Sequence, residues 1–185
     1  TNIFPNSRVI NMDASSNFQD SLPISSDTLL KQLDAWEIHY KRYDHVPLQT
    51  VKDSKEIQDM FLPTKKGGGH IKNLYLRDKK KRNVLFIAEQ DAEIDLKKLG
   101  NAIGFANLSF GSPERLMQNL GIRAGAVTPL SMITGVKNNV SLFLDSNLKN
   151  CSNIYVHPLV NDRTLEISLT ELEKFLRIVG AGFDW

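Results

Sequence analysis

A lysine stands on the apolar face of a predicted strand, where its charge could do chemistry. The segment Ile71–Leu76 reads IKNLYL, and side chains alternate between faces in a strand, so Lys72 shares a face with Leu74 and Leu76. A charge there costs free energy unless its stem reaches water or its ammonium meets an oxygen acceptor or an anion. Lys72 therefore either extends to solvent or forms a fixed positive charge that can hold a phosphate or polarise a carbonyl oxygen.

Three loops near predicted strand ends could complete a site around such a lysine. The glycines at 67–69 can bring backbone close to a ligand, or can form a flexible connector. The stretch 125–129, read GAVTP, predicts a rigid turn with free backbone donors and acceptors, suited to a small polar group or simply to a generic turn. His157 precedes Pro158, which favours an extended backbone at a strand end, where a single histidine can be structural or catalytic.

The signatures of several enzyme classes are absent from the sequence. It contains no G-x-S-x-G, no H-E-x-x-H, no phosphate loop ending in G-K-[ST] and no G-x-G-x-x-G. The histidines show no close metal-ligand pairing, so we predict no metal site and no cofactor. The histidines are His39, His45, His70 and His157.

Composition indicates one soluble domain. The 185 residues are 41% hydrophobic and 24% charged, and no apolar run approaches the roughly 20 residues that cross a bilayer. The start carries no basic segment followed by a hydrophobic one, and the single cysteine, Cys151, cannot form an internal disulfide. These features predict a cytosolic protein without membrane contact.

Basic residues gather in two places although the net charge is only +2. Lys79, Lys80 and Lys81 lie in RDKKKRN, which is either a phosphate contact for RNA or a solvated hairpin tip. Lys65 and Lys66 adjoin the glycine loop and are better placed for an RNA backbone. A nucleic-acid partner would therefore be bound through a local basic footprint.

The pattern of apolar residues predicts an α/β domain over residues 26–185, after a flexible tail or linker over residues 1–25. The chain starts at Thr and its Asn- and Ser-rich beginning lacks periodicity, which suggests a segment of a longer polypeptide. Helices are predicted at 27–36, with Ser26 or Asp27 as the cap, and at 54–62, 95–104, 112–121 and 168–180. Strands are predicted at 37–45, 71–78, 83–89, 140–146, 153–160 and 164–169.

The connections between these elements favour a mixed, mostly antiparallel sheet. The strands at 71–78 and 83–89 flank a short charged segment and predict an antiparallel hairpin. Hairpins and short connections outnumber regular strand-helix-strand units, so a doubly wound parallel sheet is disfavoured.

The chain resembles the YbaK-type aminoacyl-tRNA editing domains, and among them the prolyl-tRNA editing proteins. The resemblance rests on an ordered set of segments that together span about residues 27 to 180. These segments are GGHIKNLYLRDKK, DLKKLGNAIG, LSFGSPERLMQNLG, AGAVTPLSMI and HPLVNDRTLEISLTELEKFL. The resemblance implies a compact α/β fold around a mixed, barrel-like sheet.

The resemblance also implies roles for particular residues. The key lysine of the family's K-N-L-[FY]-L motif falls on Lys72, and the next residue is Asn73. The family's G-x-x-x-P loop and its H-P-L-x-N motif supply the substrate-binding residues. These are Gly125, Ala126, Val127, Thr128 and Pro129 of the loop, and His157 and Asn161 of the motif.

The activity implied by the resemblance is hydrolysis of a misacylated tRNA, with alanyl-tRNA(Pro) as the expected substrate. An activated ester needs only a positioned water or substrate hydroxyl and stabilisation of charge, which fits the lack of a catalytic triad. The expected partners are tRNA(Pro) carrying alanine and a prolyl-tRNA synthetase, in cis or in trans, with no DNA. Two alternatives stay open: a deacylase for cysteine or serine, and a module that binds tRNA or a synthetase without turnover.

Overall fold

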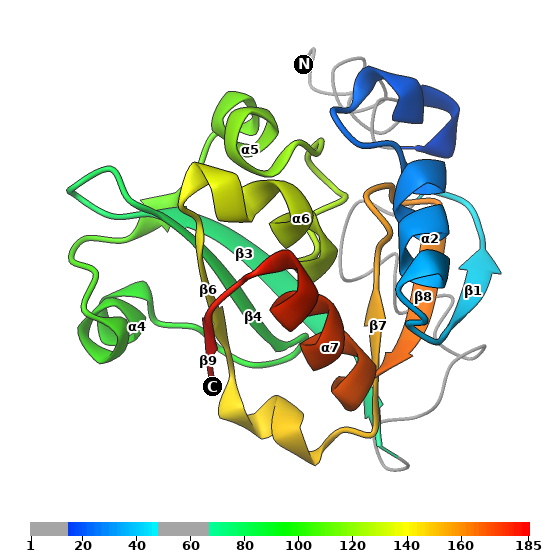
Figure 1. Ribbon diagram of the computed structural model, residues 1–185. Helices are drawn as coiled ribbons and strands as arrows, with labels where there is room; N and C mark the ends of the chain where they lie inside the picture. The colour runs from blue at the N-terminus through cyan, green and yellow to red at the C-terminus, as the bar shows by residue number, and fades with distance from the viewer. Residues whose placement is uncertain (1–14, 48–66) are drawn as a thin grey trace.

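Two mixed β-sheets form the frame of the computed structural model, which describes residues 15–47 and 67–185 (Figure 1). The four-stranded sheet has the order β1 (Tyr40–Asp44), β8 (Arg163–Ser168), β7 (Asn153–Val156) and β2 (Gly68–Gly69). The five-stranded sheet has the order β5 (Ser109–Phe110), β3 (Ile71–Arg77), β4 (Asn83–Glu89), β6 (Ser141–Leu144) and β9 (Phe183–Asp184). The expected mixed α/β architecture is confirmed.

The expected barrel-like closure is not found among the described residues. β2, β5 and β9 are two-residue strands that end their sheets, and such short strands leave edges that nothing closes. Pairing is antiparallel for β1–β8, β7–β8, β3–β4 and β3–β5, and parallel for β2–β7, β4–β6 and β6–β9. The predicted hairpin of β3 and β4 is confirmed, with Lys72 opposite Ala88.

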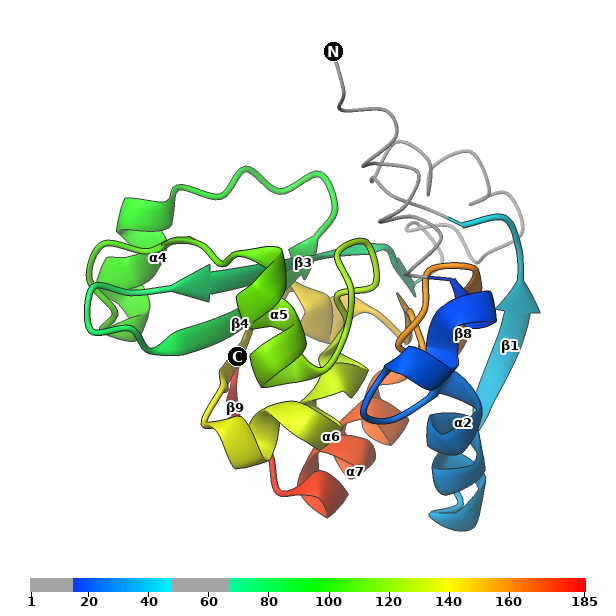
Figure 2. The same ribbon diagram turned by 90° about the horizontal axis from the view of Figure 1, so that it is seen from above.

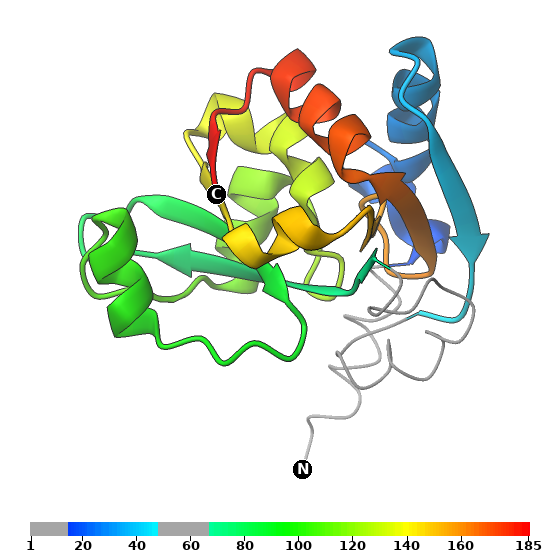
Figure 3. The same cartoon turned by 90° about the horizontal axis from the view of Figure 1, so that it is seen from below.

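Helices cover both faces of the five-stranded sheet. Figures 2 and 3 show α4 (Leu96–Ile103) on one side, and α5 (Pro113–Leu120), α6 (Met132–Gly135) and α7 (Leu169–Val179) on the other. α2 (Ser26–Ala35) lies beside β1 and β8. Four 3-10 helices complete the described elements: η1 (Ser16–Ser21), η4 (Pro129–Ser131), η5 (Val136–Asn138) and η6 (Ser146–Asn150). The helix predicted at 54–62 lies outside the described residues.

The helix starts follow the capping rules with one correction. Ser112 and Ser168 accept hydrogen bonds from backbone N–H groups three residues on and cap α5 and α7, as polar residues do at this position. The cap of α2 is Ser25, which accepts from the amide of Thr28, so the expected cap at Ser26 or Asp27 is wrong. Asp27 instead binds Arg163, which explains why its side chain is engaged elsewhere.

Residues 15–25 pack against the body of the molecule, which differs from the flexible segment that their composition suggests. Leu22 is 7% exposed and belongs to the main hydrophobic cluster. Ser16 donates from its amide and its hydroxyl to the Asp162 carboxylate, at 2.8 and 2.5 Å. The periodicity of a regular helix is lacking because η1 is a short 3-10 turn. Residues 1–14 of the predicted tail lie outside the described part.

The core is divided by the five-stranded sheet. The main cluster fills the space between this sheet, the four-stranded sheet and helices α2, α5, α6 and α7, and includes Leu33, Ile87 and Phe175. A second, smaller cluster lies under α4 and includes Leu76 and Phe86. Alternate residues of β3 and β4 therefore face different clusters, which fixes the register of the hairpin.

Candidate active site

The glycine loop joins the two sheets through close backbone contact. Gly68 and Gly69 pair in parallel with Asn153 and Ile154 of β7. A Cβ atom on Gly69 would lie 2.8 Å from the carbonyl oxygen of Asn153, and Gly67 has a positive φ of 93°. Glycine is required here because the chain turns and passes close to another backbone. Residues 67–69 are therefore a paired segment and not a loose connector.

The parallel register carries two predicted site residues to the same end of this junction. Lys72 follows Gly69 by three residues, and His157 follows Ile154 by three residues in the same direction. Between them the ring of His70 stacks on that of Tyr155, with centroids 5.0 Å apart. The pairing therefore continues beyond β2 and places the start of β3 beside the end of β7.

Lys72 points toward the face of the smaller cluster, as the alternation predicts. It lies opposite Ala88, and Leu74 lies opposite Phe86, both of which belong to this cluster. The partly buried ammonium group donates to the carbonyl oxygen of Ala92, in the segment that joins β4 to α4. The charge is thus held against a backbone oxygen instead of extending freely into solvent.

A cavity adjoins the segment that holds Lys72. Its volume is about 570 Å³, and it lies between β4, the 92–95 segment and α4. The side chains that line it are Phe86, Glu93, Ile94, Asp95, Lys98 and Leu99. Since Phe86 is opposite Leu74, the cavity opens on the same sheet face as Lys72.

Asn73 points to the opposite face and carries a buried acceptor. It lies opposite Ile87, a residue of the main cluster. Its side-chain oxygen Oδ1 is buried and has no hydrogen-bond partner among the described residues. An unsatisfied buried acceptor costs about 1–3 kcal/mol, so such an atom needs an explanation, and a donor on a bound ligand is one.

The turn 125–129 is rigid and presents one partly exposed side chain. Gly125 has a positive φ of 94°, and the Thr128 hydroxyl accepts from the amide of Leu130 at 3.2 Å. Ala126 and Thr128 are fully buried, Pro129 is buried, and Val127 is partly exposed at the margin of the main cluster. Figures 1 to 3 show this turn, between α5 and α6, running next to the loop that follows β7.

His157 is held by the loop in which it lies. Its Nδ1 atom is 3.0 Å from the carbonyl oxygen of Arg163, which can only accept, so Nδ1 carries the proton and Nε2 of the neutral ring is an acceptor. The ring of His45 lies 6.5 Å away, centroid to centroid, and its Nε2 is 2.7 Å from the Thr164 hydroxyl. Asn161, four residues after His157, is fully buried.

The surroundings of His157 favour its neutral form. Burial lowers the pKa of its imidazole from the usual 6.5, and the nearby His45 lowers it further, outweighing the Arg163 carbonyl. The unfolded chain binds a proton on His157 below pH 6.5 that the folded chain does not. Stability therefore rises with pH in the window between the lowered pKa and 6.5.

We expect the free energy of unfolding to fall as the pH drops below about 6.5, by up to ~1.4 kcal/mol per pH unit from this one group. Denaturant unfolding of the wild type and His157→Gln at a series of pH values measures the effect. His157→Gln should flatten the slope in this window, whereas His39→Gln, at an exposed position, should leave it unchanged. Equal slopes in wild type and His157→Gln would contradict the expectation.

The predicted basic residues are not brought to the site. Lys79, Lys80 and Lys81 lie in the turn after β3, at the opposite end of that strand from Lys72. Lys65 and Lys66 lie outside the described residues. Sequence reasoning also missed two contacts: the Ala92 carbonyl, which no side-chain pattern could reveal, and His45, for which the only signal was a histidine at the end of a predicted strand.

Two further findings concern the described part of the chain. No three His, Cys, Asp or Glu side chains within it are grouped so that they could hold a metal ion. No helix within it is both long and apolar enough to cross a membrane.

The comparisons with known proteins agree with this architecture. The aminoacyl-tRNA editing domain family matches residues 48–175. The prolyl-tRNA editing protein ProX of Acetoanaerobium sticklandii is 33% identical over 86% of this chain and 94% of its own length. Prolyl-tRNA synthetase associated domain-containing protein 1 of Danio rerio is 34% identical over 57% of this chain and 58% of its own length.

A solved structure supports the fold alone. The crystal structure of the hypothetical protein APE2540 has a TM-score of 0.64 at 15% identity, and the match covers 84% of this chain and 96% of that one.

The chain therefore belongs to the aminoacyl-tRNA editing domain family, whose members are aminoacyl-tRNA deacylases. Within that family it is of the YbaK/ProX type.

Proposed function

We propose that this chain hydrolyses the ester bond of a misacylated tRNA and that its substrate is alanyl-tRNA(Pro). The observation that carries the proposal is the Lys72 ammonium, which is partly buried and held by a carbonyl oxygen at the junction of the two sheets. Membership of the editing family and the similarity to ProX support the reaction class.

Lys72 supplies the positive charge that the reaction needs. Its partner, the Ala92 carbonyl, is the same kind of oxygen that an ester carbonyl or a terminal phosphate offers. A lysine has a flexible four-carbon stem and three rotatable donors, so the ammonium can exchange one oxygen for another. In the tetrahedral intermediate the carbonyl oxygen becomes negative, and a fixed ammonium stabilises it more than it stabilises the ester.

Asn73 and the 125–129 turn orient the aminoacyl group. The α-ammonium of an aminoacyl ester is a donor, and the buried Oδ1 of Asn73 is an acceptor without a partner in the described residues. Both Asn73 and the turn border the main cluster, whereas Lys72 faces the smaller one. The ester would thus be held where the start of β3 separates the two faces, with its amino group on one side and its carbonyl oxygen reached from the other.

Steric exclusion accounts for selectivity between alanine and proline. A synthetase cannot reject a substrate that lacks a few methylenes by more than about 1–3 kcal/mol, so a second, smaller pocket has to remove the error. Val127 is partly exposed beside the His157 loop, and a pocket bounded by these two residues would exclude a pyrrolidine ring. The neutral His157 imidazole leaves this pocket uncharged.

The attacking group comes from the substrate side. An aminoacyl ester is activated, and a bound water or the terminal ribose hydroxyl can attack once it is positioned. The names of the relatives point to a prolyl-tRNA synthetase as the protein that generates the misacylated tRNA, and we propose it as the partner in cis or in trans.

The proposal is tested by incubating the chain with tRNA(Pro) carrying alanine, proline, serine or cysteine in parallel. We expect the alanyl ester to disappear much faster than its uncatalysed rate while the prolyl ester is spared. Preferred loss of the seryl or cysteinyl ester would replace alanine as the substrate. Decay of all four at the uncatalysed rate, with tRNA still bound, would support a binding module without turnover.

A further inference from the structure

One aromatic side chain is exposed at the edge of the five-stranded sheet. Phe110 in β5 is 67% exposed, and among the described residues only two other large hydrophobic side chains, Val46 and Ile178, are classed as exposed. β5 pairs with β3 only at Leu76 and Arg77. An exposed phenylalanine on a strand offers a flat apolar surface that solvent alone does not favour.

Phe110 lies on the same face of the sheet as Lys72. It is opposite Leu76 in β3, and directly opposed side chains in antiparallel strands point to the same face. Lys72, Leu74 and Leu76 share that face by alternation, and Leu74 between them is only partly buried. Four residues of strand separate Lys72 from Leu76, which is about 13 Å.

The edge that carries Phe110 is fixed in place. The amide of Gly111 donates to the Tyr75 carbonyl at 3.0 Å, and a Cβ on Gly111 would lie 2.2 Å from the Tyr75 ring. The Tyr75 hydroxyl is held in turn by Asn83, at 2.7 Å, and by Asn119, at 3.0 Å. Phe110 is therefore presented by a packed strand, so little conformational entropy is lost when a ligand stacks on it.

The turn at the end of the hairpin is also ordered. Asp78 is 4% exposed, and its carboxylate accepts from the amides of Lys80 and Arg82 and from the Arg82 guanidinium. Burial acts to raise the pKa of Asp78, but the hydrogen bonds from Arg82 outweigh it and the pKa is lowered. Arg82 also covers the Phe105 ring, at 4.0 Å from its centroid.

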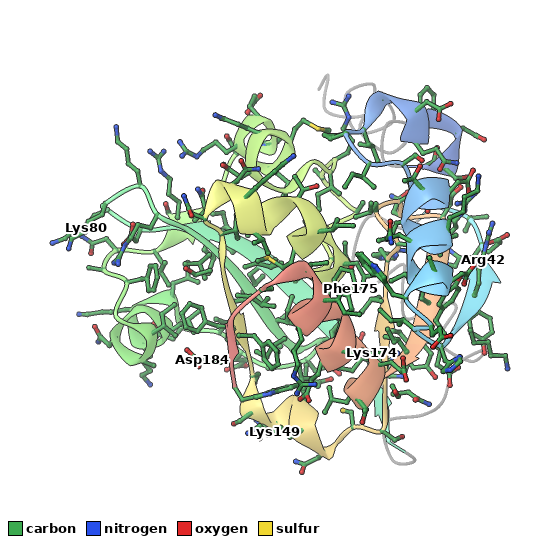
Figure 4. All side chains as sticks on the ribbon, in the orientation of Figure 1. Arg42, Lys80, Lys149, Lys174, Phe175 and Asp184 are labelled. Atoms are coloured by element: carbon green, nitrogen blue, oxygen red, sulfur yellow. The ribbon has the colours of Figure 1, made fainter. Side chains whose placement is uncertain are left out.

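This turn concentrates the positive charge of the chain. Residues 77–82 carry five cations and one carboxylate, a net charge of +4, against +2 for the whole chain, so the rest is net negative. Lys79, Lys80 and Lys81 are exposed, and their ammonium groups have no ion-pair partner in the described part of the molecule. In Figure 4, Lys80 projects away from the body at the far end of the hairpin.

We propose that the hairpin is the docking rail for the acceptor arm of the tRNA, with Phe110 stacking on a base of the unpaired 3′ strand and Lys79, Lys80 and Lys81 contacting stem phosphates. The proposal rests on the function proposed above. Stacked nucleotides repeat every 3.4 Å or so along a strand, and the ~13 Å between Lys72 and Phe110 corresponds to about four of them. That is the length of the unpaired end of a tRNA, so an ester at Lys72 would place the last unpaired base near Phe110.

The chemistry of this surface favours RNA over a protein partner. An aromatic platform beside a row of unpaired lysines matches the way in which single-stranded nucleic acid is held, by stacking on bases and by neutralising phosphates. Protein interfaces are depleted in lysine at their centre. Phe110 has no other exposed large hydrophobic side chain beside it in sequence with which to form an apolar patch.

The test uses uncharged RNA hairpins with the sequence of the tRNA(Pro) acceptor stem, with or without the unpaired 3′ strand, and measures binding by fluorescence anisotropy. Phe110→Leu should weaken binding of the complete hairpin about tenfold, Phe110→Tyr should not, and Ile178→Ala on α7 should have no effect. The loss should vanish for the hairpin without the unpaired strand. Equal affinity of wild type and Phe110→Leu would overturn the proposal, as would a loss of self-association or protein binding without a loss of RNA binding.

The charges are tested by the dependence of affinity on salt. Replacing Lys79, Lys80 and Lys81 by glutamine should lower the slope of log affinity against log salt by about 2, for both hairpins. An unchanged slope would overturn the phosphate contacts. Because binding is measured without an ester, RNA binding that needs Phe110 together with absent deacylation would reject the proposed function alone, whereas deacylation with Phe110-independent binding would reject only the docking rail.

Discussion

Lys72→Ala should reduce deacylation of alanyl-tRNA(Pro) by about 10²- to 10³-fold, the loss that follows removal of one preorganised donor at a developing oxyanion. The ammonium acts on the charge that forms in the transition state, so the loss should appear in kcat more than in KM. Single-turnover hydrolysis under saturating enzyme measures it. The affinity for the uncharged acceptor hairpin should change little, because only one of several contacts with the RNA is removed.

Lys174→Ala is the matched control. The Lys174 ammonium also donates to a backbone carbonyl, that of Glu37, at 3.0 Å, but it lies on α7, away from the sheet junction (Figure 4). This variant should keep the wild-type rate. Lys72→Arg keeps the charge with a larger, planar group and should recover only part of the activity. If Lys72→Ala hydrolysed the ester as fast as Lys174→Ala, the ammonium would have no role in the reaction.

The β3–β4 hairpin shows how far local patterns reach. Its register follows from alternation, because Lys72, Leu74 and Leu76 have to share one face and Asn73 and Tyr75 the other. Which cluster each face contacts was not predictable, since it depends on where α4 and the remaining helices pack. The sequence therefore indicated that Lys72 faces inward, but not that it faces the smaller cluster.

The elements that sequence reasoning missed are those held by distant partners. β2, β5 and β9 have two residues each, too few for a period to be recognised. β2 is formed because glycines allow contact with β7, more than eighty residues away in the chain. The predicted strand over 153–160 ends at Val156, because the backbone turns at His157 toward the bond with Arg163. The expectation of a barrel failed for the same reason, since closure depends on how sheet edges pair.

The candidate site was foreseen as residue types and not as an arrangement. Lys72, the 125–129 turn and His157 were each recognisable from local composition and from the family resemblance. The buried amide oxygen of Asn73 and the proximity of His45 to His157 depend on packing between segments that are far apart in sequence. Phe110 is a similar case, because nothing in its neighbours indicates that β5 leaves it exposed.

Helix α7 holds the two sheets and α2 together, and its central residue is Phe175. This side chain is fully buried, and its ring lies 6.3 Å from that of Trp36 at the end of α2 (Figure 4). The helix follows β8 directly, capped by Ser168, so its orientation is fixed by the four-stranded sheet. The same sheet carries His157 and the pairing with the glycine strand.

Phe175→Ala should lower the free energy of unfolding by about 3–5 kcal/mol, since the buried ring is lost and a cavity is left where α7, α2 and the main cluster meet. Equilibrium denaturation in urea measures the change. Ile178→Ala is the control on the same helix: this side chain is 42% exposed, and its loss should cost well under half as much. Similar losses for both variants would mean that the helix is stabilised by its own propensity and not by burial of Phe175, and the main cluster would then not hold the two sheets in the register on which the site depends.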